Sequence, residues 1–331
     1  MTEPHITVHD LTKTYRVPER DPGLLASLRS LVHPGFRPVE AVSGINFSIN
    51  TGEVVGFIGP NGAGKTSTLK MLSGLLSPSS GSALVAGFIP WERKPDYLRR
   101  ISMVLGNKSQ LIWDIPPLDS FRVLAEIYSI PRVAYKRSLD ELVAILEMED
   151  LLTRPVRNLS LGERMKCELV AGLLHQPEVL FLDEPTLGLD VSMQKRLRTF
   201  IGGYNQLHGA TIILTSHYMA DVAALCPRVI LIHDGQIKYD GALAGLAERL
   251  APFKLVRVTL DQSVSERPGS LDLPAGAELL EAENGCFTLR VGRSETPYVT
   301  SWLLNNLEVI DLTVEDPPLE AVIDKVYQEG L

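Results

Sequence analysis

The sequence predicts an α/β fold in which helices cover a mainly parallel sheet and a small α+β domain follows. Three observations lead to this prediction. Buried apolar segments alternate with helical patterns from "VVGFI" at 54–58 to "RVILI" at 228–232, an alternation typical of parallel sheets. A glycine-rich loop separates the first of these strands from its helix. After about residue 252 the pattern changes to short alternating strands.

The composition is that of an ordinary folded protein. The chain has 331 residues, of which 45% are hydrophobic and 22% charged, so it is long enough for two domains. Its three cysteines, Cys167, Cys226 and Cys286, lie far apart without metal-ligand spacing, which predicts no disulfide framework and an intracellular, reducing compartment. The net charge of -8 argues against a nucleic-acid scaffold, so we expect no nucleic-acid partner.

The chain by itself is expected to cross no membrane. No apolar run approaches the roughly 18 residues that a bilayer requires. The first residues, "MTEPHITVHD", lack the basic-then-apolar pattern of a signal peptide.

A first domain is predicted over residues 1–245. Residues 5–17 alternate like an edge strand, and residues 17–40, rich in Pro, Gly and Arg, predict an inserted loop with a short helix at 24–31. Residues 107–158 carry apolar side chains at three-to-four spacing and predict a helical subdomain. The other expected elements are strands at 41–49, 54–59, 179–183 and 211–216 that form the sheet with an antiparallel edge, and helices at 65–75, 163–175 and 191–207.

A second, accessory domain is predicted over residues 252–331. Four short strands alternate polar and apolar residues there, and helical patterns occur at 296–306 and 318–328. This mixture predicts a small α+β fold, whose role could be regulation, dimer contact or cargo binding.

The segment "GPNGAGKT" matches the pattern G-x-x-x-x-G-K-[ST] and stands between a strand and a helix, where that motif binds phosphate. Its glycines allow backbone N–H groups to surround the phosphate, and the helix N-terminus adds partial positive charge. Lys65 is expected to reach the β and γ phosphates, and the Thr66 hydroxyl to bind Mg²⁺. The chain therefore has a predicted P-loop NTPase core. The predicted nucleotide-binding residues of this segment are Gly59, Pro60, Asn61, Gly62, Ala63, Gly64, Lys65, Thr66 and Ser67.

Acidic and basic side chains follow two other strands. Asp183 and Glu184 come at the end of "VLFLD", where ligands bind in this architecture. Asp183 is predicted to hold Mg²⁺ through water, and Glu184 to orient or deprotonate the attacking water. His217 ends "TIILTSH" and could contact the γ-phosphate. The alternatives are a solvated acidic turn and an ordinary surface or core histidine.

The segment "RNLSLGERMK" predicts a second helix start. Ser160 is expected to be the N-cap and Glu163, three residues on, its capping-box partner. A capped helix explains this segment completely, but a glycine-containing helix start can also hold an anion.

Taken together, these motifs resemble the nucleotide-binding subunit of ATP-binding cassette (ABC) transporters over roughly residues 5–240. "LSLGE" at 159–163 is similar to the family signature L-S-G-G-Q, with Leu161 in place of a glycine and Glu163 in place of the glutamine. The resemblance implies that Ser160, Leu161, Gly162 and Glu163 clamp the γ-phosphate of ATP held by a second copy. The implied active unit is a head-to-tail homodimer with ATP and Mg²⁺.

The resemblance also implies roles for single residues. Tyr15 corresponds to the aromatic residue that stacks on adenine, the alternative being a half-exposed strand tyrosine. Glu184 corresponds to the catalytic glutamate and His217 to the switch histidine, so we predict hydrolysis. Asp190, in "LGLD", corresponds to the loop that couples the two sites. Asn107 is expected to supply the amide that contacts Mg²⁺, with Gln110 as the alternative.

Several segments are most similar to bacterial exporter ATPases, such as those of daunorubicin and other drug or polysaccharide exporters. That resemblance implies integral membrane permease subunits and a peripheral position on the cytoplasmic face of the inner membrane. Ile112, Trp113 and Ile115 would suit a groove for a permease helix, or else pack in the subdomain core. Two other functions remain open: a soluble ABC ATPase of DNA maintenance or translation, and a nucleotide-binding clamp without hydrolysis.

Overall fold

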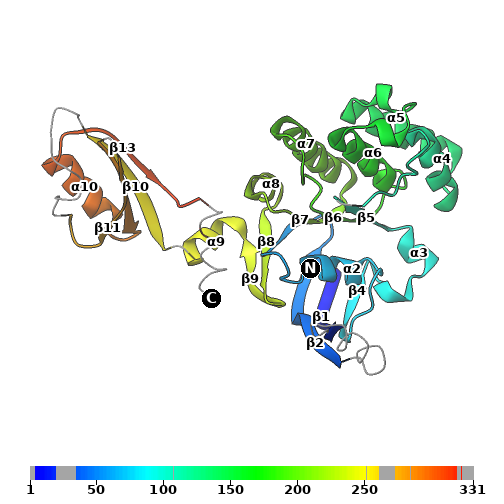
Figure 1. Ribbon diagram of the computed structural model, residues 1–331, viewed down its shortest axis with the longest axis horizontal. Helices are drawn as coiled ribbons and strands as arrows, with labels where there is room; N and C mark the ends of the chain where they lie inside the picture. The colour runs from blue at the N-terminus through cyan, green and yellow to red at the C-terminus, as the bar shows by residue number, and fades with distance from the viewer. Residues whose placement is uncertain are drawn as a thin grey trace, which may run out of the picture. The chain divides into compact units, whose positions relative to one another are not determined.

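The computed structural model describes residues 4–19, 35–106, 108–250, 252–260, 273–283, 285–318 and 322. The chain divides into two compact units, Met1–Asp240 and Gly241–Leu331, which are considered separately (Figure 1).

The first unit is built on a six-stranded sheet with the order β5-β6-β7-β3-β8-β9. The first five of these pair in parallel. β9 follows β8 through Asp234 and Gly235, both with positive φ, and a turn this short joins only antiparallel strands. Every residue of β3, β6 and β7 is buried, because helices cover both faces. The strands are β3 (Val54–Ile58), β5 (Ile101–Leu105), β6 (Val179–Asp183), β7 (Thr211–Thr215), β8 (Arg228–His233) and β9 (Gln236–Ala242).

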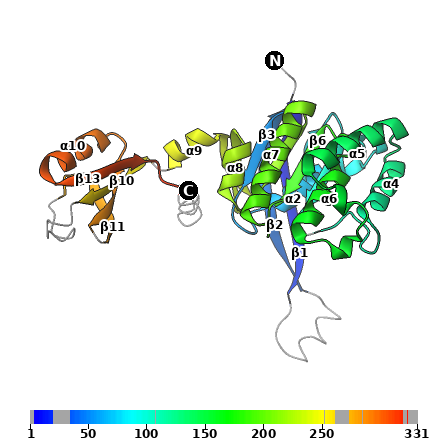
Figure 2. The same cartoon turned by 90° about the horizontal axis from the view of Figure 1, so that it is seen from above.

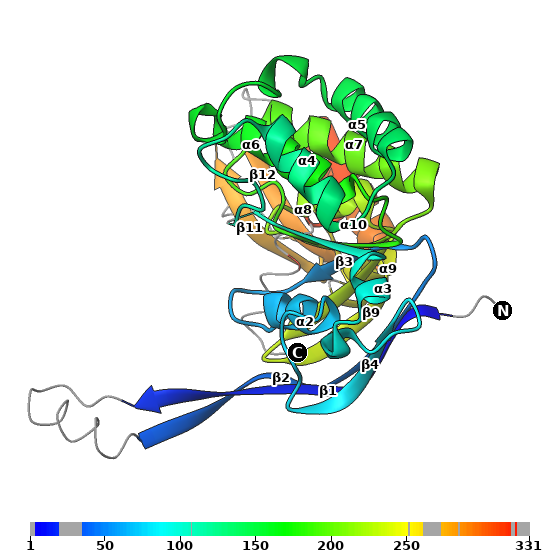
Figure 3. The same cartoon turned by 90° about the vertical axis from the view of Figure 1, so that its right-hand side faces the viewer.

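Helices lie on opposite faces of this sheet. α2 (Lys65–Leu72) lies on one face, and α6 (Leu161–Leu173), α7 (Val191–His208) and α8 (Met219–Leu225) lie on the other (Figures 1 and 3). The parallel strands β3, β6 and β7 end at the same edge, so the residues that follow them gather there. The predicted α/β class with a mainly parallel sheet and an antiparallel edge is confirmed.

The predicted helical segment forms α4 (Pro117–Ile127) and α5 (Arg132–Leu146), followed by single 3₁₀ turns η2 (Glu149–Leu151) and η3 (Val156–Asn158). Figure 1 shows α4 and α5 grouped with α6. Before them, η1 (Pro90–Glu92) and α3 (Pro95–Leu98) connect to β5. Among the described residues, no helix combines the length and apolar character needed to cross a membrane.

A three-stranded antiparallel sheet, ordered β2-β1-β4, completes the first unit. Its strands are β1 (Pro4–Glu19), β2 (Gly35–Asn50) and β4 (Ser80–Val85). The prediction that β1 is an edge strand is wrong, because β1 lies between two partners. Alternation of polar and apolar residues reports one buried face and carries no information on the number of neighbouring strands.

β1 and β2 run side by side as a long ribbon, with pairing from Pro4 and Asn50 to Glu19 and Gly35 (Figures 2 and 3). The predicted loop at 17–40 therefore differs from the structure at both ends, where residues 17–19 and 35–40 are strand. Pro18 and Pro38 suggested a loop, but each lies where the ribbon has a neighbour on only one side. The rest of that segment, including the helix predicted at 24–31, lies outside the described residues.

The second unit contains a four-stranded antiparallel sheet with the order β11-β12-β10-β13. Its core joins inward residues of the strands, such as Val258 and Leu289, to Val299 and Leu303 of α10. This confirms the predicted α+β character. The helix predicted at 318–328 lies outside the described residues except for positions 318 and 322. The elements are α9 (Leu243–Leu250), β10 (Phe253–Leu260), β11 (Ala277–Glu283), β12 (Cys286–Gly292), α10 (Thr296–Asn306) and β13 (Val309–Glu315).

Candidate functional site

The phosphate loop connects β3 to α2 and depends on glycine at two positions. A Cβ at Gly59 would stand 2.2 Å from the Ile232 carbonyl oxygen, and one at Gly64 would stand 2.4 Å from that of Ala41. Gly64 also has φ 109°, which favours glycine. No heavy atom would lie within 4 Å of a Cβ at Gly62. The loop is thus packed against the sheet on one side and open on the other, as a phosphate cradle requires.

Lys65 begins α2 and is 5% exposed. Its ammonium donates to the carbonyl oxygens of Gly59, at 2.6 Å, and Pro60, at 3.0 Å, so it lies across the loop. Burial lowers the pKa of Lys65, while the carboxylates of Glu184 and Asp183 raise it. A buried cation beside backbone donors is a fitting partner for a phosphate group.

Thr66 and Asp183 lie together at the end of β6. The Thr66 hydroxyl donates to both carboxylate oxygens of Asp183, at 3.0 and 3.2 Å, and the Thr215 hydroxyl donates to Oδ1 at 2.7 Å. Asp183 is 7% exposed. A hydroxyl and a carboxylate are oxygen ligands of the kind that Mg²⁺ uses with substrate phosphates and water. With Lys70, Lys108 and Glu184, these two residues line a hollow of about 100 Å³.

Glu184 follows Asp183 and takes the left-handed conformation, φ 55°, which is strained for a residue with a side chain. Two bonds hold it there, because its N–H donates to the carbonyl and the hydroxyl of Thr215, both at 3.1 Å. Its carboxylate oxygen lies 2.8 Å from His217 Nε2. The two predicted catalytic side chains therefore lie in contact, next to the candidate Mg²⁺ ligand Asp183.

Tyr15 lies on β1, and its hydroxyl is 3.1 Å from the Ser67 hydroxyl on α2. The Lys13 ammonium lies 5.5 Å from the centre of the Tyr15 ring. This contact brings the predicted adenine-stacking residue to the helix that carries Lys65 and Thr66.

Of the two candidate amides, Asn107 lies outside the described residues. Gln110 is exposed, and its side-chain N–H donates to the Met103 carbonyl at 3.2 Å. Within the described part of the chain, Gln110 does not line the hollow at Thr66 and Asp183.

The predicted capping box at the start of α6 is present. Ser160 Oγ accepts from the Glu163 N–H at 3.3 Å, and the Glu163 carboxylate accepts from the Ser160 N–H at 2.8 Å. The Ser160 N–H, more than the Arg154 guanidinium at 3.2 Å, holds the pKa of Glu163 below its usual value. The carboxylate is thus turned back onto its own helix start and partly neutralised.

Leu161 packs against the turn before α7, and Gly162 against the first turn of α7. Gly188 has φ 74°, and a Cβ there would stand 2.8 Å from Leu161 Cδ2, while a Cβ at Gly162 would lie 3.4 Å from Met193. Asp190 is the N-cap of α7 and accepts from the Met193 N–H at 2.8 Å. The signature residues and Asp190 therefore form a second cluster, and in the described structure none of them lines the hollow at Thr66 and Asp183.

Two buried carboxylates beside this site were not predicted. Glu168, 3% exposed on α6, accepts from the Ser109 hydroxyl and from the Gln110 N–H at 2.9 Å. Burial raises the pKa of Glu168. The sequence does mark Glu168, because it is the one charged residue in the apolar run 167–174.

Asp221, fully buried on α8, accepts from Thr186, from Ser216 at 2.7 Å and from Arg198 at 2.7 Å. It therefore fixes the segments that follow Glu184 and precede His217. No local motif marks Asp221, because two of its three partners, Thr186 and Arg198, come from other parts of the chain.

Comparison with known proteins decides the family. The family profile for ABC transporters matches residues 42–187. ABC transporter ATP-binding protein NatA of Bacillus subtilis is 36% identical over 63% of this chain and 85% of that protein. This chain belongs to the ABC transporter ATP-binding proteins. It is an ATP-binding subunit and an ATPase that uses ATP with Mg²⁺, as predicted, and the non-transport alternatives are not favoured.

Other relatives of this ABC ATP-binding protein carry transport names. Nod factor export ATP-binding protein I of Ralstonia nicotianae is 31% identical over 72% of this chain and 71% of that protein. Bacitracin transport ATP-binding protein BcrA of Bacillus licheniformis is 32% identical over 60% and 63%. Proteins of this family act with membrane permease components and dimerise.

Solved structures and a second profile agree with the fold. An ATP-binding subunit of an ABC transporter matches 74% of this chain and 92% of that chain, with a TM-score of 0.62 and 24% identity. A dimeric ATP-binding cassette bound to ADP and phosphate matches 72% and 98%, with a TM-score of 0.59 and 21% identity. Residues 252–315 match the C-terminal domain profile of EvrA-like ABC transporters.

Proposed function

We propose that this chain is the motor subunit of a bacterial exporter, in which two copies bind two ATP molecules between them, head to tail. Each nucleotide lies between the loop Gly59–Thr66 of one copy and the segment Ser160–Glu163 of the other. One observation carries this proposal. The chain has a second helix start suited to an anion, yet that helix start lies outside the hollow at Thr66 and Asp183. A second copy would bring it to the phosphate.

In this complex, Glu184 orients or deprotonates the attacking water, and His217 holds the Glu184 carboxylate and contacts the γ-phosphate. Thr66 and Asp183 would hold Mg²⁺, Asp183 through water, and the ion would supply positive charge against the phosphates. Tyr15 stacks on adenine, with Ser67 fixing its hydroxyl.

The remaining predicted residues act at the edges of the site. Asp190 couples the two composite sites across the dimer. Asn107 supplies the amide near Mg²⁺. Gln110, whose backbone is tied to Glu168, links that loop to the signature helix.

Transport follows from linkage between ATP and dimer closure. ATP binds the closed dimer better than the open one, and hydrolysis removes the phosphate that joins the copies. A shift from about 1:99 to 99:1 in favour of closure requires on the order of 5 kcal/mol of differential affinity. Permease subunits would convert this motion into alternating access.

A surface of the first unit is suited to a permease segment. A hollow of about 530 Å³ lies between α3, β5 and α4, lined by apolar side chains such as Leu75, Leu98 and Ile127 and by Gln110. Ile112 and Trp113, nearby in sequence, are about half exposed, which argues against simple core packing. Docking here would hold the protein at the cytoplasmic face of the inner membrane.

The direction of transport and the domain limits are part of the proposal. Export is supported by the Nod factor relative, whose name states it. We assign residues 1–245 to the ATPase domain and residues 252–331 to an accessory domain.

The first experiment is light scattering of purified Glu184→Gln protein with and without ATP and Mg²⁺, beside the ATPase rate of the unmodified chain. We expect a dimer only with ATP, because blocked hydrolysis traps the closed state. Ser160→Arg in the same background should stay monomeric, whereas Ser82→Arg, at an exposed position of β4, should dimerise normally. A Ser160→Arg variant that still dimerises with ATP would refute the head-to-tail arrangement.

A further inference from the structure

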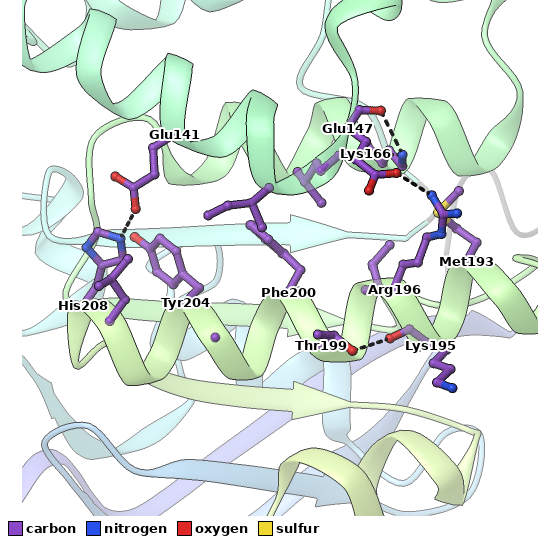
Figure 4. Close-up of a pocket in the computed structure, with 15 residues that line it drawn as sticks. Glu141, Glu147, Lys166, Met193, Lys195, Arg196, Thr199, Phe200, Tyr204 and His208 are labelled. Carbon is purple, nitrogen blue, oxygen red and sulfur yellow. Dashed lines mark hydrogen bonds and ion pairs between the residues drawn. The ribbon is translucent and has the colours of Figure 1, made fainter.

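A groove of about 400 Å³ lies between α5 and α7, and none of its residues belongs to the proposed ATP site. Its volume is in the range of small-molecule pockets. Figure 4 shows Phe200 and Tyr204 projecting from α7 towards α5, with one set of charged residues at each end of the groove.

The floor of the groove is apolar. Leu146, Leu197 and Phe200 are each 5% exposed or less, whereas Ile145 and Leu207 at the rim are more than half exposed. Contact with a ligand would remove these rim side chains from water, which favours an apolar occupant.

Most charged groups at the two ends already have partners, and Lys195, which also lines the groove, is exposed to solvent. His208 Nε2 lies 3.2 Å from Glu141, and Arg196 lies 3.0 Å from Glu147. The Lys166 ammonium donates to the Leu146 carbonyl at 2.6 Å at the end of α5. A charged ligand is therefore not required to satisfy them.

Unlike those charged groups, the Tyr204 hydroxyl is buried without a hydrogen-bond partner in the described structure. Tyr204 is 5% exposed. Burial, and after it the negative charge of Glu141 on α5, raises the pKa of Tyr204, so the group is a neutral hydroxyl. Its ring lies 4.4 Å from that of His208. Buried hydroxyls normally have a partner, and an acceptor on a molecule bound in the groove would supply one here.

We propose that this groove binds a small, largely apolar molecule with a hydrogen-bond acceptor. Its aromatic or acyl body packs on Phe200 and Leu146, and its acceptor receives the Tyr204 O–H. No residue of the phosphate loop or of the Glu184 pair takes part.

The groove also adjoins the start of α6. Met193 lines it, and the same side chain lies against Gly162. Lys166 joins α6 to the end of α5. An occupant therefore changes the ATPase rate through the signature helix, a consequence that rests on the function proposed above.

The binding test uses anilinonaphthalene sulfonate, a fluorescent amphiphile whose sulfonate is an acceptor, with saturating ADP and Mg²⁺ to block the nucleotide site. We expect one probe per chain. Tyr204→Phe should weaken binding on the order of 2- to 10-fold, since one hydrogen bond is lost. Gly203→Trp should weaken it by about tenfold or more, because a Cβ at this lining position meets no atom within 4 Å and a large side chain there can cover the groove.

Gly202→Ala is the matched control, since a Cβ there faces Leu225 of α8 at an ordinary 3.6 Å. It should bind the probe as the unmodified chain does, and thermal unfolding checks that all variants fold. Equal affinity in Tyr204→Phe, Gly203→Trp and the unmodified chain would overturn the proposal.

The coupling is tested separately. The probe should shift the ATPase rate of the unmodified chain and leave that of Gly203→Trp unchanged. A bound probe with no effect on rate would refute the coupling, while binding itself is measured without hydrolysis and so does not depend on the proposed function.

Discussion

Replacement of Glu163 by glutamine separates the two effects of its carboxylate. The amide keeps an oxygen for the Ser160 N–H, which lies 2.8 Å away, so the capping box survives. The negative charge is lost at the start of α6, which removes about 0.3–1 kcal/mol of interaction with the helix dipole. The Arg154 pair, 46% and 30% exposed, contributes about 0.2–1 kcal/mol. We expect Glu163→Gln to lower the free energy of unfolding at pH 7 by roughly 0.5–2 kcal/mol.

The pH dependence tests this reasoning. The folded state lowers the pKa of Glu163 from the ordinary 4.5, so its stabilisation is present above pH 4.5 and disappears as the pH falls through the folded value. Urea unfolding should therefore show a difference between Glu163→Gln and the unmodified chain that vanishes in acid. Ser160→Ala is the control, with a loss of about 1 kcal/mol that titrates only in part, because the Ser160 side chain also contributes to the lowered pKa of Glu163.

The same substitution should strengthen ATP-driven dimerisation. Removing a negative charge near the second copy's γ-phosphate reduces repulsion, by on the order of 1 kcal/mol in water at close range. Light scattering in the Glu184→Gln background measures this as a lower ATP concentration for half-dimerisation. A stability difference that persists in acid, together with unchanged dimerisation, would refute the account of Glu163.

Substitutions at three further positions have expected outcomes. Gly59→Ala should abolish ATP binding in calorimetry and destabilise the loop by about 1–3 kcal/mol, because the new Cβ meets the Ile232 carbonyl; normal ATP binding would contradict this. Glu168→Ala should cost ~1–3 kcal/mol in urea unfolding for each donor left unpaired, and Glu168→Gln less; equal losses would show that the acceptors do not matter. Arg198→Ala should cost about 3–5 kcal/mol, since it leaves Asp221 buried without its cation; a cost below about 1 kcal/mol would argue against that pair.

Local patterns explain what the sequence could predict. The cap at Ser160 and the strand-loop-helix order around Lys65 depend on neighbours within a few residues, so both could be predicted from the sequence. The central position of β1 in its sheet could not be predicted, because strand pairing joins segments that are distant in the sequence. Asp221 was missed for the same reason, since its partners Thr186 and Arg198 are brought to it only by folding.

The packing of Leu161 over Gly188 restricts how this protein can vary. A Cβ at 188 would stand 2.8 Å from Leu161 Cδ2, so the large side chain at one position requires none at the other. Restoring the family's glycine at 161 would leave a void above the turn before Asp190, and adding a side chain at 188 would displace Leu161. Because Gly188 also has φ 74°, a conformation that favours glycine whatever stands at 161, we expect position 188 to stay glycine among close relatives. The variation is then confined to position 161, where any side chain has to pack on this turn.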